Sequence, residues 1–230
     1  MDIQLFSTII EIIGVISFSI SGAMVAIKRK ADLFGVVLLA IITALGGGLT
    51  RDVIFSFSPP TIFSLKYYII ICALVAILVF MCARRYKTFY LENEVKIEHI
   101  NDIFDSLGLG IFAVMGVKVA IERGFENSGF IAISCGVLTC ICGGMLRDVF
   151  TKSMPFILEK RIYALAATAG AVAYYYMYLG GVNDSAAIII GTLVTFLLRI
   201  LAIIFKWNLP KAIDWGERYG KESNNTCCCR

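Results

Sequence analysis

Charge and histidine are both scarce in this 230-residue sequence. Only 17% of its residues are charged and 59% are hydrophobic, whereas soluble domains carry about 25% charged residues. The single histidine, His99, leaves almost no room for histidine-based metal chemistry. No nucleophile and general base occur together in a recognisable arrangement, which disfavours an enzyme. These absences exclude a soluble enzyme, a disordered protein and a secreted disulfide scaffold, and they indicate a polytopic membrane protein.

Long apolar stretches occupy nearly the whole chain. A helix that crosses the hydrocarbon core needs about 20 mostly apolar residues. We therefore expect an all-α membrane protein with seven transmembrane helices in one domain (residues 1–206), a solvated linker at 84–102 and a polar cytoplasmic tail (207–230). The expected helices are Leu5–Ile27, Leu33–Phe55, Leu65–Ala83, Ile103–Ile121, Gly129–Phe150, Ile162–Leu179 and Ala186–Phe205.

Lysine and arginine are distributed unevenly over the expected loops. With seven helices, one side of the membrane holds only Lys66 and Arg123, and nearly all other basic residues outside the helices lie on the opposite side. The positive-inside rule then predicts a bacterial inner membrane protein with its N-terminus outside and its C-terminus in the cytoplasm. The first apolar stretch has no basic lead-in, which favours a retained helix over a cleaved signal peptide.

The eight cysteines form no metal-binding or disulfide pattern. Five lie in the expected helices, where cysteine is usually a small apolar filler. Cys227, Cys228 and Cys229 cluster in the tail, where a lipidation site or a metal clip is an alternative to no role. We expect no metal site, no cofactor and no nucleic-acid partner.

The chain contains two related halves. The pattern GxxxFxxxGxxVAIxR starts at Gly14 and again at Gly108, and the pattern GGxxRDV starts at Gly47 and again at Gly143. Because each half holds three helices, the second half must be inverted in the membrane, as in many transport proteins. We expect repeat one at about 5–83, repeat two at about 99–179 and an unrepeated seventh helix at about 186–205.

Adjacent glycines near the middle of the second and fifth helices predict a break in each. Glycine weakens a helix interior by about 1 kcal/mol relative to alanine, and freed backbone groups are tolerated in a membrane only where they are buried or line a wet cavity. We expect their carbonyls, with nearby hydroxyls, to line the path of a monovalent cation. Close helix crossing, and serine hydroxyls that bond back to helix carbonyls, are the alternatives. The expected pathway residues are Gly46, Gly47, Gly48, Gly143, Gly144, Ser17, Ser21 and Thr50.

Charged side chains inside the expected helices form the second candidate site, because such residues are rare in a membrane and functional by default. Each Arg-Asp pair has an acid at matching depth on the first helix of its own repeat. We expect Glu11 to pair with Arg51 and Asp105 with Arg147, either at the two mouths of a pathway or as locks between helices. The full set of charged candidate residues, which also includes Lys118, is Glu11, Arg51, Asp52, Asp105, Lys118, Arg147 and Asp148.

Two further basic residues break the repeat symmetry. Lys118 corresponds to Met24 in the first half. We expect it either to extend to the lipid headgroups or to face the pathway as a possible gate. Arg199, in the seventh helix, is expected to extend to the inner surface or to bind anionic lipid.

The doubled GGxxRD pattern, in a chain of this length with seven expected helices, resembles the prokaryotic trimeric intracellular cation (TRIC) channels, also catalogued as a glycine-transporter-like bacterial family. The resemblance covers about residues 5–206. It implies a homotrimer in lipid, one pore per protomer beside kinked second and fifth helices, and potassium-preferring conduction. It also implies that Gly47, Gly48, Gly143 and Gly144 line the pore, and that Lys118 is a basic residue of the kind linked to gating in eukaryotic relatives. Their lysine-glutamate-valine lipid motif is absent here.

Two other functions fit parts of the sequence. A secondary transporter of a small amino acid such as glycine would use the same inverted-repeat plan, with half-helix ends holding the substrate's carboxylate and amine. A membrane scaffold explains the hydropathy but not the symmetric glycines. The acids in the expected helices have arginines nearby, which favours a channel slightly over a proton-coupled transporter.

Overall fold

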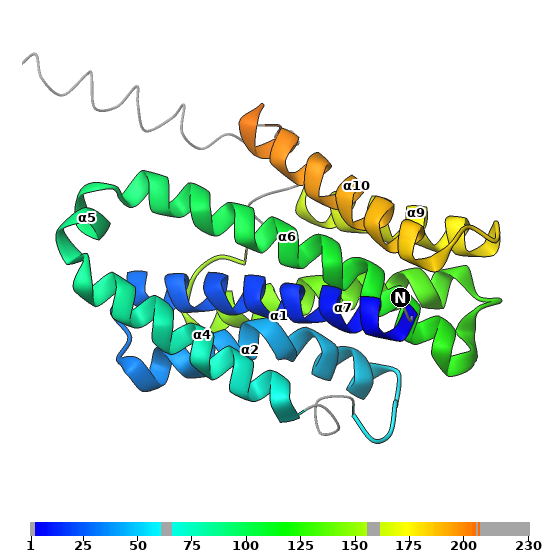
Figure 1. Cartoon of the computed structure of the whole chain (residues 1–230), viewed down its shortest axis with the longest axis horizontal. Coiled ribbons are helices and arrows are strands. Elements are labelled where there is room, and N and C mark those ends of the chain that lie inside the picture. The colour runs from blue at the N-terminus through cyan, green and yellow to red at the C-terminus, as the bar shows by residue number, and fades with distance from the viewer. Residues whose placement is uncertain (1–2, 61–65, 156–161, 206, 208–230) are drawn as a thin grey trace, which may run out of the picture.

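In the described part of the computed structural model, which Figure 1 shows as a bundle of helices, six helices are long and apolar enough to cross a membrane. The structure describes residues 3–60, 66–155, 162–205 and 207. A further apolar helix, α9, has 17 residues and is therefore about 26 Å long, and it completes the expected set of seven. Most of the tail, with its three cysteines, lies outside the described residues. The helices are α1 (Ile3–Lys28), α2 (Leu33–Ile54), α4 (Lys66–Arg85), α5 (Lys87–Glu92), α6 (Glu94–Ala120) followed by η1 (Ile121–Phe125), α7 (Gly129–Phe150), α9 (Tyr163–Leu179) and α10 (Asp184–Ile204).

The expected linker at 84–102 is mostly helical, and most of its described residues are exposed, which agrees with a solvated connection. Helix α5 occupies its first part, and α6 begins at Glu94, well before the apolar stretch. The charged first turns of α6 lie beside the end of α1, where Lys28 makes ion pairs with Glu94 (3.3 Å) and Glu98. Hydropathy marks only the apolar part of a helix, so it misses this extension.

The two halves of the chain repeat each other in space, as the sequence predicted. Helices α1 and α6, which begin the two halves, run in opposite directions (Figure 1). A Cβ atom on Gly22 of α1 would lie 2.6 Å from Oγ1 of Thr43, and one on Gly116 of α6 would lie 2.6 Å from Oγ1 of Thr139. These two glycines allow α1 to approach α2, and α6 to approach α7, in the same way. The repeats are therefore α1–α2–α4 and α6–α7–α9.

The ends of α2 and α7 place the two Arg-Asp pairs at equivalent points. After each helix the chain turns through a residue with φ of 54°, Ser56 in the first half and Lys152 in the second. The next amide then donates to the carbonyl of the motif's aspartate, at 2.8 Å for Asp52 and 2.9 Å for Asp148. Because α2 and α7 point in opposite directions (Figure 1), the two motifs lie at opposite ends of the bundle.

The seventh apolar helix, α10, packs on the outside of repeat two against α9 and α6. Its other face is apolar and exposed, as is most of α4. Such surfaces suit lipid or another copy of the chain. On α10 the exposed side chains include Ile189, Ile190, Leu193, Leu197 and Ile204.

Candidate ion pathway

Helices α2 and α7 cross where two glycines allow their backbones to touch. A Cβ atom on Gly47 would collide with the carbonyl oxygen of Thr139, and one on Gly143 would collide with that of Thr43. Gly46 also packs, against a leucine side chain of α7. Both helices run through their glycines without interruption. The expected break is therefore wrong, and close crossing explains the glycines at these positions.

Gly48 and Gly144 follow the crossing glycines and are not used for it. A Cβ atom on Gly48 would have one neighbour within 4 Å among the described residues, Nη2 of Arg51 at 3.9 Å. A Cβ atom on Gly144 would lie 3.2 Å from the phenol oxygen of Tyr163 and 3.8 Å from Nη2 of Arg147. The two glycines therefore sit beside the arginines of the two motifs, with little or no backbone pressing on them.

The Arg51 cluster comprises Glu11 of α1, Arg51 and Asp52 of α2, and Tyr68 of α4. The Tyr68 hydroxyl donates a 2.6 Å hydrogen bond to Glu11, while Arg51 donates to Asp52 through Nε at 2.8 Å and Nη2 at 2.6 Å. Glu11, Arg51, Tyr68 and Gly48 line a cavity of about 70 Å³, which has room for more than one water molecule. The expected ion pair of Glu11 with Arg51 stays a prediction: the two side chains share this cavity, and Glu11 accepts a hydrogen bond from Tyr68.

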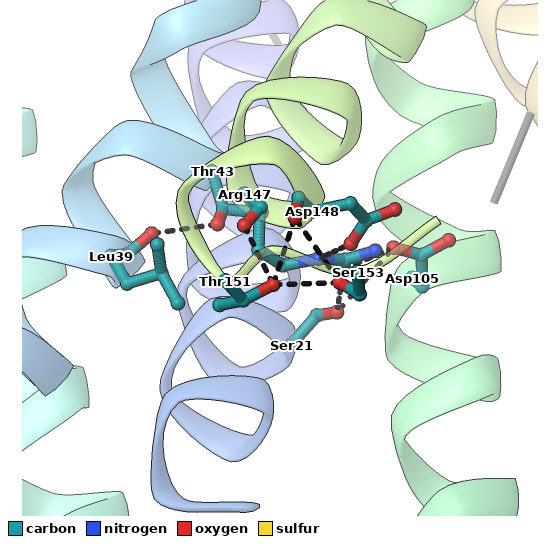
Figure 2. A network of polar contacts seen from close by, with 8 residues as sticks. All are labelled: Ser21, Leu39, Thr43, Asp105, Arg147, Asp148, Thr151 and Ser153. Carbon is teal, nitrogen blue, oxygen red and sulfur yellow. Dashed lines mark hydrogen bonds and ion pairs between the residues drawn. The ribbon is translucent and has the colours of Figure 1, made fainter. Parts of the chain in front are cut away.

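The Arg147 cluster lies at the other end of the bundle and comprises Ser21 of α1, Asp105 of α6, and Arg147 and Asp148 of α7. Nη1 of Arg147 donates to Asp105 at 2.8 Å and to Ser21 at 2.7 Å, and Nε donates to Asp148 at 2.8 Å (Figure 2). Every member is at most 2% exposed. The predicted pairing of Asp105 with Arg147 is confirmed, and α1 joins it through a serine.

A larger cavity, of about 570 Å³, reaches the Arg147 cluster from its own end of the bundle. Its polar lining includes Asp148, Lys152 and Ser153 at the end of α7, and Glu98 and Asp102 on α6. On both α2 and α7 the crossing glycine comes before the arginine in the sequence. Because the two helices are antiparallel, the crossing therefore lies between the two clusters. Each cluster therefore adjoins its own cavity, with tightly packed helix backbone between them.

Of the hydroxyl groups predicted to line the pathway, two bond within their own helix and one joins a charged cluster. Ser17 donates to the carbonyl of Ile13 at 2.8 Å, and Thr50 donates to that of Gly46 at 2.7 Å. Both bonds lie within a single helix and are the alternative expected for such side chains. Ser21 alone of the three joins a charged cluster.

Lys118 links two helices on the outside of repeat two. Its Nζ donates to Asp184, the first residue of α10, at 2.6 Å, and to Ser7 of α1 at 3.2 Å. Tyr174 of α9 donates to the other oxygen of Asp184 at 2.8 Å. The lysine and aspartate side chains are 14% and 17% exposed. Lys118 thus makes a half-buried link between α6 and α10, and its two expected roles, extension to the headgroups and facing the pathway, stay predictions.

This link gives a testable stability effect. Lys118→Met introduces the residue found at the equivalent position, Met24, and leaves Asp184 without its ion-pair partner. We expect the free energy of unfolding to fall by about 2 kcal/mol, measured by thermal unfolding in detergent. Adding Asp184→Asn should recover most of the loss, because no buried charge is then stranded. A single variant that melts like the wild type would contradict this role.

Sequence reasoning missed three residues of the site. Tyr68 near the start of α4 and Tyr163 at the start of α9 each lie beside the charged cluster of their own repeat. The offset that aligns Gly47 with Gly143 pairs Tyr163 with Tyr67, so the sequence repeat does not single out these two tyrosines. Arg199 of α10 was expected to extend to the inner surface or to bind anionic lipid. It is instead 2% exposed, with its Cζ 4.9 Å from the centroid of the Tyr163 ring.

Comparison with known proteins places these features in a family. The family model for "Glycine transporter" matches residues 8–84 and 102–179, which are the two repeats. A membrane protein of Vibrio cholerae is 31% identical over 202 residues, covering 88% of this chain and 81% of its own. The inner membrane protein YadS of Escherichia coli is 32% identical over 218 residues, covering 91% and 98%.

Solved structures show the same arrangement of helices. The TRIC trimeric intracellular cation channel orthologue from Rhodobacter sphaeroides superposes with a TM-score of 0.78 at 30% identity, covering 87% of this chain and 98% of that one. A second prokaryotic TRIC channel gives a TM-score of 0.78 at 31% identity, covering 90% and 100%. These neighbours are ion channels and not enzymes. The chain thus belongs to the prokaryotic TRIC channel family, whose bacterial members are also described by the glycine-transporter model.

Proposed function

We propose that this protein is a monovalent cation channel that prefers potassium, with one pathway in each protomer. The observation that carries the proposal is the pair of equivalent charged clusters, one at each end of the bundle, beside Gly48 and Gly144. Their arrangement accompanies a fold shared with TRIC cation channels.

The formal charges of the clusters favour a cation. Each cluster contains one arginine and two carboxylates, so each is net negative when its groups are ionised. A ring of acidic side chains and oxygen ligands is a common way to attract a cation and replace part of its water shell. In the Arg51 cluster, the oxygens of Glu11 and Tyr68 line the cavity that an ion would enter.

The pathway passes Gly48 and Gly144 and is closed between them in the arrangement described. Opening requires a small shift of α2 against α7, because their backbones are in contact at the crossing. Gly46, Gly47 and Gly143 support the pathway by holding the two helices together. No step requires a cofactor; potassium is the permeant ion and membrane lipid the surroundings.

We further propose a homotrimer in a bacterial inner membrane, with the N-terminus outside and the C-terminus in the cytoplasm. Three observations support this: the Rhodobacter sphaeroides orthologue is a trimeric channel, the Escherichia coli relative is an inner membrane protein, and lysine and arginine are distributed unevenly over the loops. In this orientation the Arg51 cluster faces outward and the Arg147 cluster faces the cytoplasm.

Planar-bilayer recording separates this function from its alternative. Purified wild-type protein should give unitary currents carried by potassium. The family model's description favours a second candidate, a transporter of a small amino acid such as glycine. Saturable, ion-coupled glycine uptake by proteoliposomes, with no unitary current in bilayers, would establish the transporter and refute the channel.

A further inference from the structure

Helix α10 has no counterpart in repeat one, yet it contributes charged side chains to repeat two at both of its ends. Near its start, Asp184 binds Lys118. Near its other end, Arg199 lies over the ring of Tyr163, and its Nε and Nη2 have no hydrogen-bond partner in the part of the chain that the structure describes. The two halves of the protein therefore differ at the points that α10 touches.

The tyrosines beside the two clusters, Tyr68 and Tyr163, take different positions in the two halves. The Tyr68 hydroxyl donates to Glu11 at 2.6 Å, which leaves Gly48 open to the cavity. Among the described residues the Tyr163 hydroxyl has no hydrogen-bond partner, and it lies over Gly144, 3.2 Å from the point where a Cβ atom would be. Tyr163 therefore covers Gly144 in the second half, whereas Gly48 in the first half is open to the cavity.

Asp105 corresponds in repeat two to Glu11 in repeat one. Its Oδ2 atom also has no hydrogen-bond partner within residues 3–60, 66–155, 162–205 and 207. A buried donor and a buried acceptor that both lack partners are costly. If Tyr163 moved to donate to Oδ2 of Asp105, repeat two would copy the arrangement that Tyr68 and Glu11 have in repeat one. That movement would satisfy both groups and uncover Gly144.

Arg199 opposes this movement. Its guanidinium lies over the Tyr163 ring at cation–π distance, and buried contacts of this kind are favourable. Moving the ring away would also leave the positive charge of the buried guanidinium with less electrostatic stabilisation.

We propose that Arg199 is a gate-positioning residue, which holds Tyr163 over Gly144 and keeps the pathway closed at the Arg147 cluster. The proposal rests on the channel function proposed above. Opening is then the exchange of the Arg199–Tyr163 contact for a hydrogen bond from Tyr163 to Asp105. The unrepeated helix is thereby the element that makes the two ends of the pathway unequal.

The first test is the open probability of Arg199→Gln in planar bilayers. Loss of one cation–π contact should raise the ratio of open to closed time roughly 3- to 10-fold. Arg199→Lys should give a smaller increase, because a charged group can still lie over the ring. Arg84→Gln is the matched control: it removes a positive charge from an exposed position at the end of α4 and should leave the ratio unchanged.

A second variant asks whether the effect acts through the tyrosine hydroxyl. In a Tyr163→Phe background the hydrogen bond to Asp105 cannot form, so Arg199→Gln should produce little or no increase in opening. A full increase in that background would overturn the proposal. So would an unchanged open ratio in Arg199→Gln, or loss of current in both Arg199 variants, since removing a restraint cannot close a gate. A wild-type protein without unitary current would instead refute the channel function itself.

Discussion

Gly47→Leu combined with Gly143→Leu is expected to prevent the native bundle from forming. Each new side chain would have to occupy the place of a backbone carbonyl on the facing helix, that of Thr139 or Thr43. Backbone cannot move aside as a flexible side chain can, so α2 and α7 would have to separate. Size-exclusion chromatography in detergent should find aggregated protein, and no cooperative unfolding transition should be seen.

Substitution of the neighbouring glycines, Gly48 and Gly144, should have the opposite effect on folding. Gly48→Leu with Gly144→Leu should fold, because these glycines have no backbone of the facing helix against them, but the added side chains should block conduction. Gly180→Leu, at an exposed position at the end of α9, is the control and should both fold and conduct. Normal conductance in the Gly48 and Gly144 variant would show that the pathway does not pass these two residues.

Arg147→Gln should cause the largest loss of stability from any single charge removal. The guanidinium is fully buried and donates to Asp105 and Asp148, so its removal leaves two buried carboxylates without compensation. Breaking a buried ion pair on one side costs about 3–5 kcal/mol. Thermal unfolding in detergent measures the loss as a lower melting temperature.

Two comparisons make that result specific. Adding Asp105→Asn to Arg147→Gln should recover part of the loss, since one stranded charge is then removed. Arg84→Gln, at an exposed position, should lower stability by less than about 0.5 kcal/mol. Equal melting temperatures for Arg147→Gln and the wild type would contradict the structural role of the cluster.

Much of the fold could be predicted because hydropathy and repetition are both local signals. The expected helix bounds of Gly129–Phe150 agree with α7, and the other apolar helices agree closely except at the start of α6. The Asp105–Arg147 pair was also predictable, because the repeat aligns an acid on the first helix of each half with the arginine on the second.

The predictions that were wrong concern contacts between helices. Such contacts depend on residues far apart in the sequence, so no local pattern reveals them. Adjacent glycines are compatible with a broken helix or with a close crossing, and only the position of Thr139 against Gly47 decides between them. The partner of Lys118 lies on α10, which has no repeat to align. Arg199 is buried because Tyr163 faces it from another helix, whereas hydropathy places an arginine near a helix end at the membrane surface.

The most direct test of the account is the reversal potential of purified wild-type protein in a planar bilayer under a potassium chloride gradient. Unitary currents should reverse close to the potassium equilibrium potential, because both charged clusters are net negative and should exclude chloride. Currents that reverse close to the chloride equilibrium potential, or no unitary current from correctly folded protein, would contradict it.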